Sequence, residues 1–191
     1  MNGQTLDPEA LRWVVDDLAY HQARVLLLVA AVAEEPGHSR KLDGLTKLAK
    51  LDFLVRYPAL AGVVLDDLAV SDHRMHISSD EISAPTEAED PMIRYRYGPW
   101  DDRYYPVVGA LVSRGLLRYL KGRNGSVALT ATAAGKKLAK SLIEEPVWRD
   151  VAERCQAIAQ ASVGLSGNAL KERIYDRLAD LMDRPHRQVI S

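Results

Sequence analysis

The sequence predicts a mainly α-helical protein with a small β wing. Apolar side chains recur at helical spacing along most of the 191 residues. The exception is LLRYLKGRNGSVALT at 116–130, where two runs of β-forming residues flank Asn124-Gly125. Asn-Gly between such runs is a strong hairpin signal, because both residues tolerate a positive φ. Helices on both sides of this hairpin predict a winged helix-turn-helix with N- and C-terminal helical extensions.

The N-terminal segment predicts a long amphipathic helix. Asp7-Pro8-Glu9 is a typical helix start, since Asp can cap the first turn, Pro suits its first position and Glu favours the positive end of the dipole. The helix is expected to end near Glu35-Pro36-Gly37. Its apolar stripe comprises Leu11, Val14, Val15, Leu18, Val25, Leu26, Val29 and Val32.

Two shorter helices and a long loop are expected next. Residues 42–58, LDGLTKLAKLDFLVRYP, predict a helix that ends at Pro58, because the residue before a proline is pushed out of the helical region. A third helix is expected around Leu60–Leu68, which completes the helix-turn-helix half. Residues 71–91 are rich in Ser, Asp, Glu and Pro without a period, and they predict a loop. The apolar side of the second helix comprises Leu42, Leu45, Leu48, Leu51, Leu54 and Val55.

The wing follows in the expected order. MIRYRY at 92–97 alternates like a strand, and GPWDDRYYPVVGALVSRG at 98–115 predicts a helix that Gly115 closes. After the hairpin, Thr130 or Thr132 is expected to cap a helix that runs to about Glu144. Residues 1–145 thus predict one winged-helix domain. Residues 146–191 predict a C-terminal extension of two helices, which either packs back on the first helix or presents a face to a partner.

Composition limits the classes of protein that fit. Hydrophobic residues make up 47% and charged residues 27%, as in globular proteins. The net charge of −1 gives no global attraction to nucleic acid, so DNA binding needs a local patch. The single cysteine, Cys155, excludes an intramolecular disulfide, and its place on an apolar helical face predicts a buried, inert thiol. With no membrane-length apolar run and no signal-peptide pattern, a cytoplasmic protein without a membrane partner is expected.

A basic segment supplies candidate DNA contacts. No Asp or Glu stands between Asp102 and Glu144. A wing tip with Lys121 and Arg123 could enter a minor groove or lie along phosphates. The alternative is a solvated basic face that is balanced by acidic surface elsewhere. The candidate DNA contacts are Arg114, Arg118, Lys121, Arg123, Lys136 and Lys137.

The helix before the hairpin is a poor reader of base sequence. In this fold that helix normally exposes Arg, Asn, Gln or Lys toward base edges. Here it offers Asp101, Asp102, Arg103, Ser113 and Arg114, so its N-terminus is acidic. Any DNA contact is therefore expected to be with the backbone and to show little sequence preference.

Aromatic residues form a second candidate surface. Tyr, Trp and Arg are the side chains that anchor protein interfaces, and RYRYGPWDDRYYP at 94–106 concentrates them. The alternative is that these rings staple the strand to the following helix. The candidate partner contacts are Tyr95, Tyr97, Trp100, Tyr104 and Tyr105.

No residue pattern predicts catalysis, a metal or a cofactor. The sequence has no Gly-rich phosphate loop, no GxSxG elbow and no HExxH motif. Asp66-Asp67 and Asp101-Asp102 fit helix-end or surface carboxylates better than a general acid and base. His73 and His76 sit three apart near two aspartates, which is an incomplete metal set. A protein that is not an enzyme is expected.

Two phrases, KLDGLTKLAKLDFLVRYP and IRYRYGPWDDRYYPVVGALVSRGLL, resemble the small middle subunits of ABC three-component systems, related to the Lamassu type of bacterial antiphage defence. The similarity covers roughly residues 40–60 and 92–135 and contains no catalytic motif. It implies a winged-helix subunit that accompanies an SMC-like ATPase, which senses foreign DNA, and an effector that is often a nuclease. A second likeness, in GPW at 98–100, is to winged-helix antitoxins and regulators.

Two functions from different classes follow. The leading hypothesis is a non-catalytic accessory subunit of an antiphage defence complex, which bridges an SMC-like ATPase and an effector and can also touch double-stranded DNA without sequence preference. The alternative is a winged-helix transcriptional regulator that dimerises through its terminal helices and places two wings on an operator.

Overall fold

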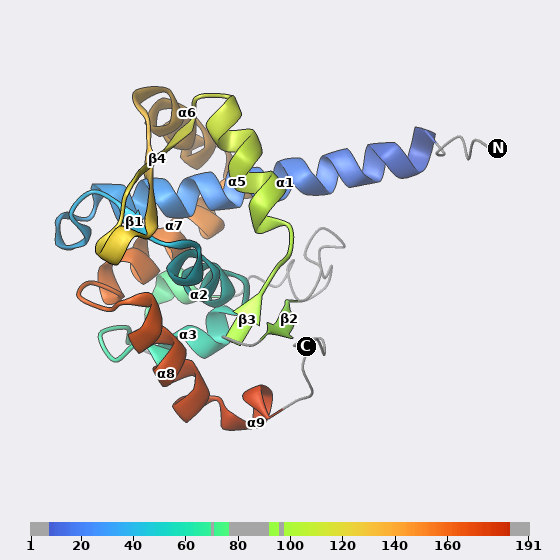
Figure 1. Cartoon of the computed structure of the whole chain (residues 1–191). Helices are drawn as coiled ribbons and strands as arrows, with labels where there is room; N and C mark the ends of the chain where they lie inside the picture. The colour runs from blue at the N-terminus through green and yellow to red at the C-terminus, as the bar shows by residue number, and fades with distance from the viewer. Residues whose placement is uncertain (1–7, 70, 77–91, 96–97, 184–191) are drawn as a thin grey trace.

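A computed structural model describes residues 8–69, 71–76, 92–95 and 98–183. It confirms a mainly helical chain with a small β-hairpin (Figure 1). The helices are α1 (Pro8–Glu34), α2 (Leu45–Arg56), α3 (Pro58–Val64), α5 (Tyr104–Ser113), α6 (Ala133–Glu144), α7 (Pro146–Ala161), α8 (Gly167–Arg177) and α9 (Ala179–Met182). The strands are β1 (Leu42–Asp43), β2 (Ile93–Tyr95), β3 (Gly98–Trp100), β4 (Leu117–Lys121) and β5 (Val127–Ala131), and the 3-10 turns are η1 (Pro36–His38), η2 (His73–Met75) and η3 (Arg123–Gly125).

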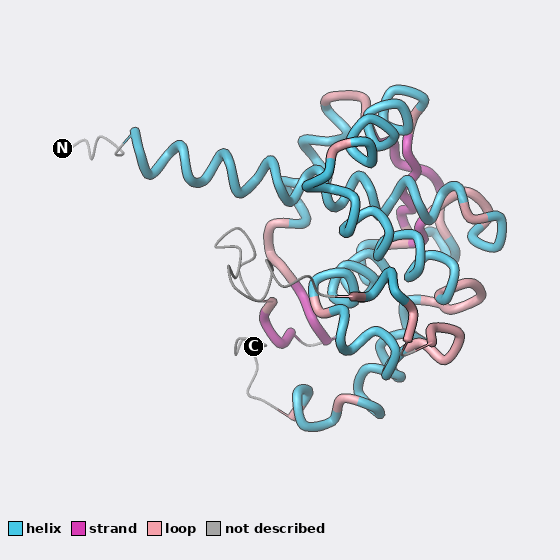
Figure 2. Tube along the Cα trace, turned by 180° about the vertical axis from the view of Figure 1, so that it is seen from behind, coloured by secondary structure: helices cyan, strands magenta, loops and turns pink. Residues whose placement is uncertain are grey.

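Helix α1 is the axis on which the other elements pack. Its C-terminal half is buried, because α5, α6 and α7 all contact it. Val25, Leu28, Val29 and Val32 are at most 1% exposed. The first turns of α1 project away from the body of the molecule (Figures 1 and 2). The helix ends at Glu34, just before the turn that begins at Pro36.

Strands β1, β5 and β4 form an antiparallel sheet in that order. The β4–β5 pair is the predicted hairpin, in which Leu117 lies opposite Ala131. Strand β1 adds Leu42 opposite Leu129. The hairpin that follows α5 is therefore anchored to the segment that joins α1 to α2.

The turn of the hairpin is wider than an Asn-Gly pair alone would give. Residues 122–126 connect the two strands, and Arg123–Gly125 form a 3-10 turn. Gly125 takes a φ of 78°, which glycine adopts without a steric penalty. The N–H of Gly122 donates to the carbonyl of Ser126 at 2.7 Å and closes the loop.

One predicted helix start was wrong. Leu42, which was assigned to the second helix, lies in β1, and α2 begins at Leu45 after Gly44 with a φ of 87°. Leu42 is nevertheless fully buried, which explains its match to the apolar pattern. In the segment 98–115, residues 98–100 are strand β3, paired with β2, and α5 begins at Tyr104, so that Pro106 lies in its first turn.

Helix α6 begins where Thr132, one of the two predicted caps, accepts a hydrogen bond from the N–H of Gly135 at 3.0 Å. The same hydroxyl donates to the carbonyl of Gly115 at 2.6 Å, which ties α6 to the end of α5. Gly135 packs so closely on the start of the hairpin that a Cβ there would collide with the carbonyl oxygen of Leu116. The glycine therefore sets how near α6 approaches the wing.

The C-terminal helices pack back on the rest of the chain. Helix α7 lies along α1, and α8 lies against α2. Cys155, Ile158, Leu170 and Ile174 are 0% exposed and belong to the same apolar cluster as α1 and α2. Of the two arrangements that the sequence allowed, α7 thus adopts the one that covers the first helix.

The expected loop at 71–91 is described only in part. Residues 71–76 contain η2, where Asp72 accepts from the N–H of Arg74 at 3.0 Å, and residues 77–91 lie outside the described residues. Among the helices that the structure describes, none combines the length and the apolar character of a membrane span.

Candidate interaction surfaces

The structure separates the five aromatic residues that were predicted to contact a partner. Tyr97 lies outside the described residues, and of Tyr95 only the backbone, in β2, is described. Tyr104 belongs to the core and not to the surface, because it is 2% exposed and its hydroxyl donates to Asp52 at 2.7 Å. Trp100 is half-buried and Tyr105 is 65% exposed. The ring centroids of Trp100 and Tyr105 lie 5.9 Å apart, so these two remain together as candidate contacts.

A buried set of ion pairs holds the start of α5 in place. Arg24 of α1 donates to both carboxylate oxygens of Asp52 in α2, at 2.7 and 3.1 Å. Arg56 of α2 donates to Asp101 at 2.9 Å, and Arg103 donates to both oxygens of the same carboxylate. Asp101 was expected to be a helix-end or surface carboxylate. It is only 8% exposed, because two guanidinium groups neutralise it.

These ion pairs stay charged at neutral pH. Burial would raise the pKa of Asp52, but the charge and hydrogen bonds of Arg24 outweigh it and hold the pKa below its usual range. Burial acts in the same direction on Asp101, and the hydrogen bonds from Arg103 hold the pKa of that carboxyl well below its usual range. Each carboxylate is paired and shielded from water, so this set stabilises the fold and supplies no general acid or base.

A groove of about 550 Å³ opens between the start of α2, strand β3, the start of α5 and the wing. Trp100 and Tyr105 line one part of it, and Val127 of the wing lines another. Lys50 also lines the groove, although it is only 1% exposed, and its Nζ donates to the carbonyl of Pro99 at 3.1 Å. Burial lowers the pKa of Lys50 to about 8. The groove therefore combines aromatic walls with one buried amine.

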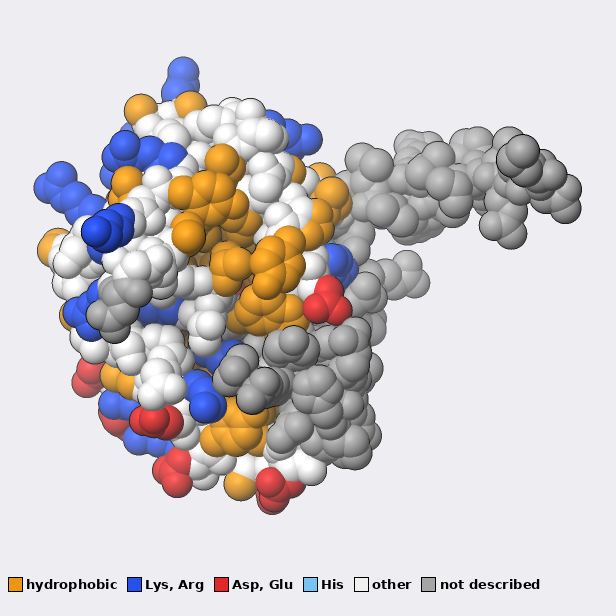
Figure 3. Space-filling view, viewed as in Figure 1, with side chains coloured by type: hydrophobic (Ala, Val, Ile, Leu, Met, Phe, Trp, Pro, Cys, Tyr) orange, Lys and Arg blue, Asp and Glu red, His pale blue; other side chains and the backbone are white. Residues whose placement is uncertain are grey.

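The exposed side of α5 lacks the side chains that read bases. Tyr105, Pro106, Gly109 and Ser113 are its exposed residues, and no charged or amide side chain occurs from Tyr104 to Ser113. Apolar side chains gather instead over the face that carries α5 (Figure 3). This face is therefore suited to a protein surface and not to base edges.

The β4–β5 hairpin adds two exposed apolar side chains. Tyr119 is 52% exposed and Val127 is 51% exposed. Tyr119 lies opposite Leu129 and Val127 lies opposite Lys121, so all four share one side of the hairpin. We refer to four residues together as the docking face: Trp100, Tyr105, Tyr119 and Val127.

The six candidate DNA contacts are all exposed but occupy separate places. Arg118 lies on the opposite side of the hairpin from Lys121, because side chains alternate along a strand. Arg123 is in the turn at the tip of the hairpin. Arg114 follows α5 and donates to the side chain of Gln22 at 2.6 Å.

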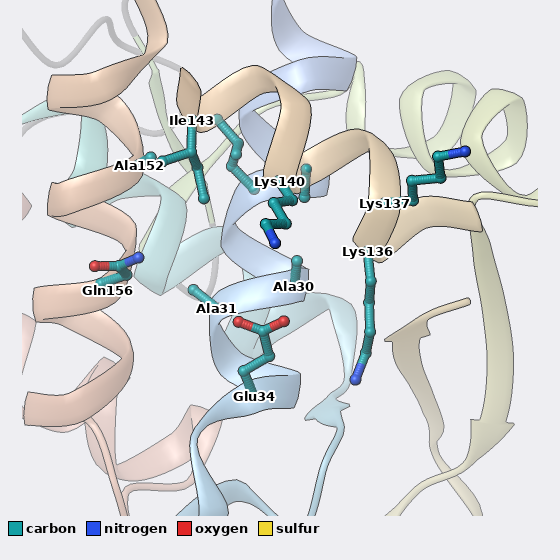
Figure 4. A pocket seen from close by; sticks show the side chains of 11 residues that line it. Ala30, Ala31, Glu34, Lys136, Lys137, Lys140, Ile143, Ala152 and Gln156 are labelled. Carbon is teal, nitrogen blue, oxygen red and sulfur yellow. The ribbon is translucent and has the colours of Figure 1, made fainter. Parts of the chain in front are cut away.

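The last two candidates lie in the first turns of α6. Lys136 and Lys137 border a groove of about 400 Å³ between α1, α6 and α7, and their side chains diverge (Figure 4). The six cations thus come from both sides of the hairpin, its tip, the end of α5 and the start of α6, and they stay candidate DNA contacts.

Residues considered for chemistry are placed apart from these surfaces. His73 and His76 are exposed in and just after η2. In the described ranges, no three His, Cys, Asp or Glu side chains gather as metal ligands would. Cys155 is fully buried, and burial raises the pKa of its thiol far above the ordinary value, as the prediction of an inert thiol requires.

Comparisons of the chain with models of protein families, with curated proteins and with solved structures found no significant match.

Proposed function

We propose that this chain is a non-catalytic, winged-helix accessory subunit that binds another protein through the docking face. One observation carries the proposal: the helix that precedes the wing exposes Tyr105, Pro106 and Gly109 where a reader of DNA would expose polar and cationic side chains. A surface of this composition is costly to leave in water, and exposed apolar patches of this kind mark interaction sites.

The order of the elements supports the winged-helix assignment. A short strand, β1, stands between α1 and α2 and pairs with the second strand of the hairpin. The hairpin directly follows α5, which takes the place of the second, groove-facing helix of a helix-turn-helix. Helix α3, η2 and the β2–β3 pair are then an insertion between the two helices of this unit.

The composition of the docking face supports a protein partner. Tyr and Trp supply much of the binding energy at protein interfaces, because they bury a large apolar area and keep a polar tip. Tyr105 and Trp100 lie beside a groove that a partner's side chain can fill, and Val127 extends the contact onto the wing.

The resemblance to the middle subunits of antiphage systems gives the partner its proposed identity. We take it to be an SMC-like ATPase, which the subunit would connect to an effector. No step of this role needs a catalytic residue in the chain itself.

Co-purification from the native host tests this proposal. A coiled-coil ATPase encoded beside the chain should be captured with it, and Val127→Glu should abolish capture by placing a charge in the interface. Val147→Glu is the matched control, because Val147 is 75% exposed on α7, away from the docking face. Equal capture by both variants, or no such ATPase with the wild-type chain, would contradict the proposal.

Contact with DNA is the second candidate, because Lys121 and Arg123 are exposed at the end of the wing. Backbone contact predicts weak binding that falls steeply with salt and does not distinguish one duplex from another. A dimeric regulator predicts tight binding to one defined duplex, which Arg123→Ala abolishes. Fluorescence anisotropy with several duplexes at two salt concentrations separates these outcomes.

A further inference from the structure

A pocket of about 480 Å³ lies beneath the tip of the wing, on the side away from α5. Four segments that are distant in the sequence surround it: turn η1, the β1–α2 segment, the hairpin turn, and the loop that leads into α8. The residues that matter for its chemistry are His38, Lys41, Asp43, Lys47, Arg123 and Gly167. No pattern in the sequence indicates that these four segments meet in the fold.

Lys47 is the central cation of this pocket and is only 7% exposed. Its Nζ lies 3.3 Å from Nδ1 of His38, while Nε2 of His38 lies 2.7 Å from the carbonyl of Ala159. A carbonyl only accepts, so the ring proton is on Nε2 and Nδ1 accepts from Lys47. The ammonium group of Lys47 is therefore held by a neutral imidazole and not by a carboxylate.

The surrounding charges leave the pocket positive. Lys41, Lys47 and Arg123 face one carboxylate, Asp43, which gives three positive charges against one negative. Lys41 is the cation nearest to Asp43, at 3.6 Å, and it also donates to the carbonyl of Lys121. Within the described ranges, Lys47 and Arg123 have no carboxylate within ion-pairing distance.

The two remaining cations act on each other. Burial lowers the pKa of Lys47 to about 8, the negative charge of Asp43 offsets part of this effect, and the positive charge of Arg123 adds to the lowering. A charged group this far buried is costly unless a counter-charge accompanies it. An anion between Lys47 and Arg123 would supply that counter-charge.

The start of α8 adds hydrogen-bond donors to the same pocket. Ser166 caps this helix by accepting from the N–H of Ala169 at 3.1 Å, which leaves the first amides of the helix available to a ligand. Gly167 approaches Lys47 so closely that a Cβ there would lie 3.1 Å from its backbone nitrogen. The glycine thus lets the start of α8 pack against the backbone of Lys47.

We propose that this pocket binds the phosphate group of a small phosphorylated molecule, such as a mononucleotide. Its volume matches sites for ligands of that size. Lys47 and Arg123 would pair with the phosphate, and the first amides of α8 would complete its hydrogen bonds. A duplex backbone would meet Arg123 at the rim but would not reach Lys47 inside. This inference does not depend on the docking face.

Isothermal titration calorimetry of the full chain with inorganic phosphate and with adenosine monophosphate tests this proposal, with sodium chloride at equal ionic strength as the blank. Both ligands should bind, and Lys47→Gln or Arg123→Gln should weaken binding about tenfold or more, because each removes a charge-assisted hydrogen bond. Lys136→Gln is the matched control, since it removes an exposed lysine on α6 and should leave the affinity unchanged.

Three results would overturn the proposal. These are no heat beyond the sodium chloride blank, equal weakening by Lys136→Gln, and binding of duplex DNA that Arg123→Gln weakens while neither small phosphate binds. If Lys47→Gln fails to fold, Arg123→Gln alone decides the outcome, because Arg123 is exposed in the hairpin turn and its replacement leaves the core intact.

Discussion

Asp52 is the residue on which three elements converge. Its carboxylate accepts from Arg24 of α1 and from Tyr104 of α5, and Arg56 of α2 lies 4.0 Å away. Helix α5 cannot be moved without breaking at least one of these bonds. The residue that positions the docking face is therefore buried in α2, distant in sequence from the face itself.

Replacement of this carboxylate should unfold the chain readily. Asp52→Asn removes the negative charge with which the buried guanidinium of Arg24 pairs, while Arg56 keeps Asp101 as its partner, and we expect a loss of about 3–5 kcal/mol in the free energy of unfolding. Asp66→Asn is the control, because Asp66 also pairs with two arginines, Arg173 and Arg177, but at the surface, and it should cost far less. Urea unfolding followed by circular dichroism measures both, and equal losses would contradict a special role for Asp52.

His21 should make the stability depend on pH. It is 2% exposed, and burial together with the charge of Arg24 lowers its pKa to about 3 from 6.5. The unfolded chain therefore binds a proton between these two values and the folded chain does not. The stabilisation is complete above pH 6.5 and is lost as the pH falls toward 3.

Between pH 7 and pH 5 this difference in proton binding amounts to about 2 kcal/mol. The phenylalanine of the His21→Phe variant cannot bind a proton, so the free energy of unfolding of this variant should fall by about 2 kcal/mol less between pH 7 and pH 5. Urea unfolding of both chains at the two pH values measures this difference. If the free energy of unfolding depends on pH in the same way in both chains, His21 is charged in the folded chain and the prediction is wrong.

At the scale of elements, the contact between α6 and the hairpin depends on one glycine. Gly135→Ala would drive a methyl group into the carbonyl oxygen of Leu116, and we expect a loss of about 2–4 kcal/mol. Gly109→Ala is the matched control in α5, where a Cβ meets nothing within 4 Å and should stabilise the helix by about 0.5–1 kcal/mol. The Tm of Gly135→Ala should fall and that of Gly109→Ala should rise relative to the wild-type chain. A change of the same sign in both variants would contradict this packing.

The hairpin, the Thr132 cap and most helices could be predicted because their signals are local. The Asn-Gly reversal and the Thr132 hydroxyl each act within a few residues of chain. Strand β1 could not, since it is only two residues long and pairs with β5, far along the chain, and β3 could not, since it has only three residues although it pairs with the neighbouring β2. A period of apolar residues does not distinguish such a strand from a turn of helix.

The candidate sites were predictable to a smaller extent. Trp100 and Tyr105 stay candidate contacts, selected because aromatic side chains near a hairpin are unusual, but the same signal also selected Tyr104, which burial against Asp52 removes from the surface. The sequence did not single out Tyr119 and Val127. The alternation in LRYLK was visible, but only the register of β4 with β5 shows which of its side chains share a side.

At the scale of the whole molecule, the C-terminal helices change how the charges are used. Helix α8 brings its N-terminus to the wing tip, so Arg123 lines a pocket beside Lys47 and does not simply extend into solvent. Trp100, Tyr105 and Val127 line a separate groove beside α5. A charge count along the sequence cannot show either pocket, because both follow from contacts between distant segments.

Hydrogen–deuterium exchange of the chain, alone and in its native complex, tests the central claim most directly. If the docking face binds a protein, amides in 98–109 and around Val127 should exchange more slowly in the complex, while those of α6 should not change. Protection confined to the hairpin tip and the start of α6, and produced equally by duplex DNA alone, would show that the wing and not the docking face makes the functional contact.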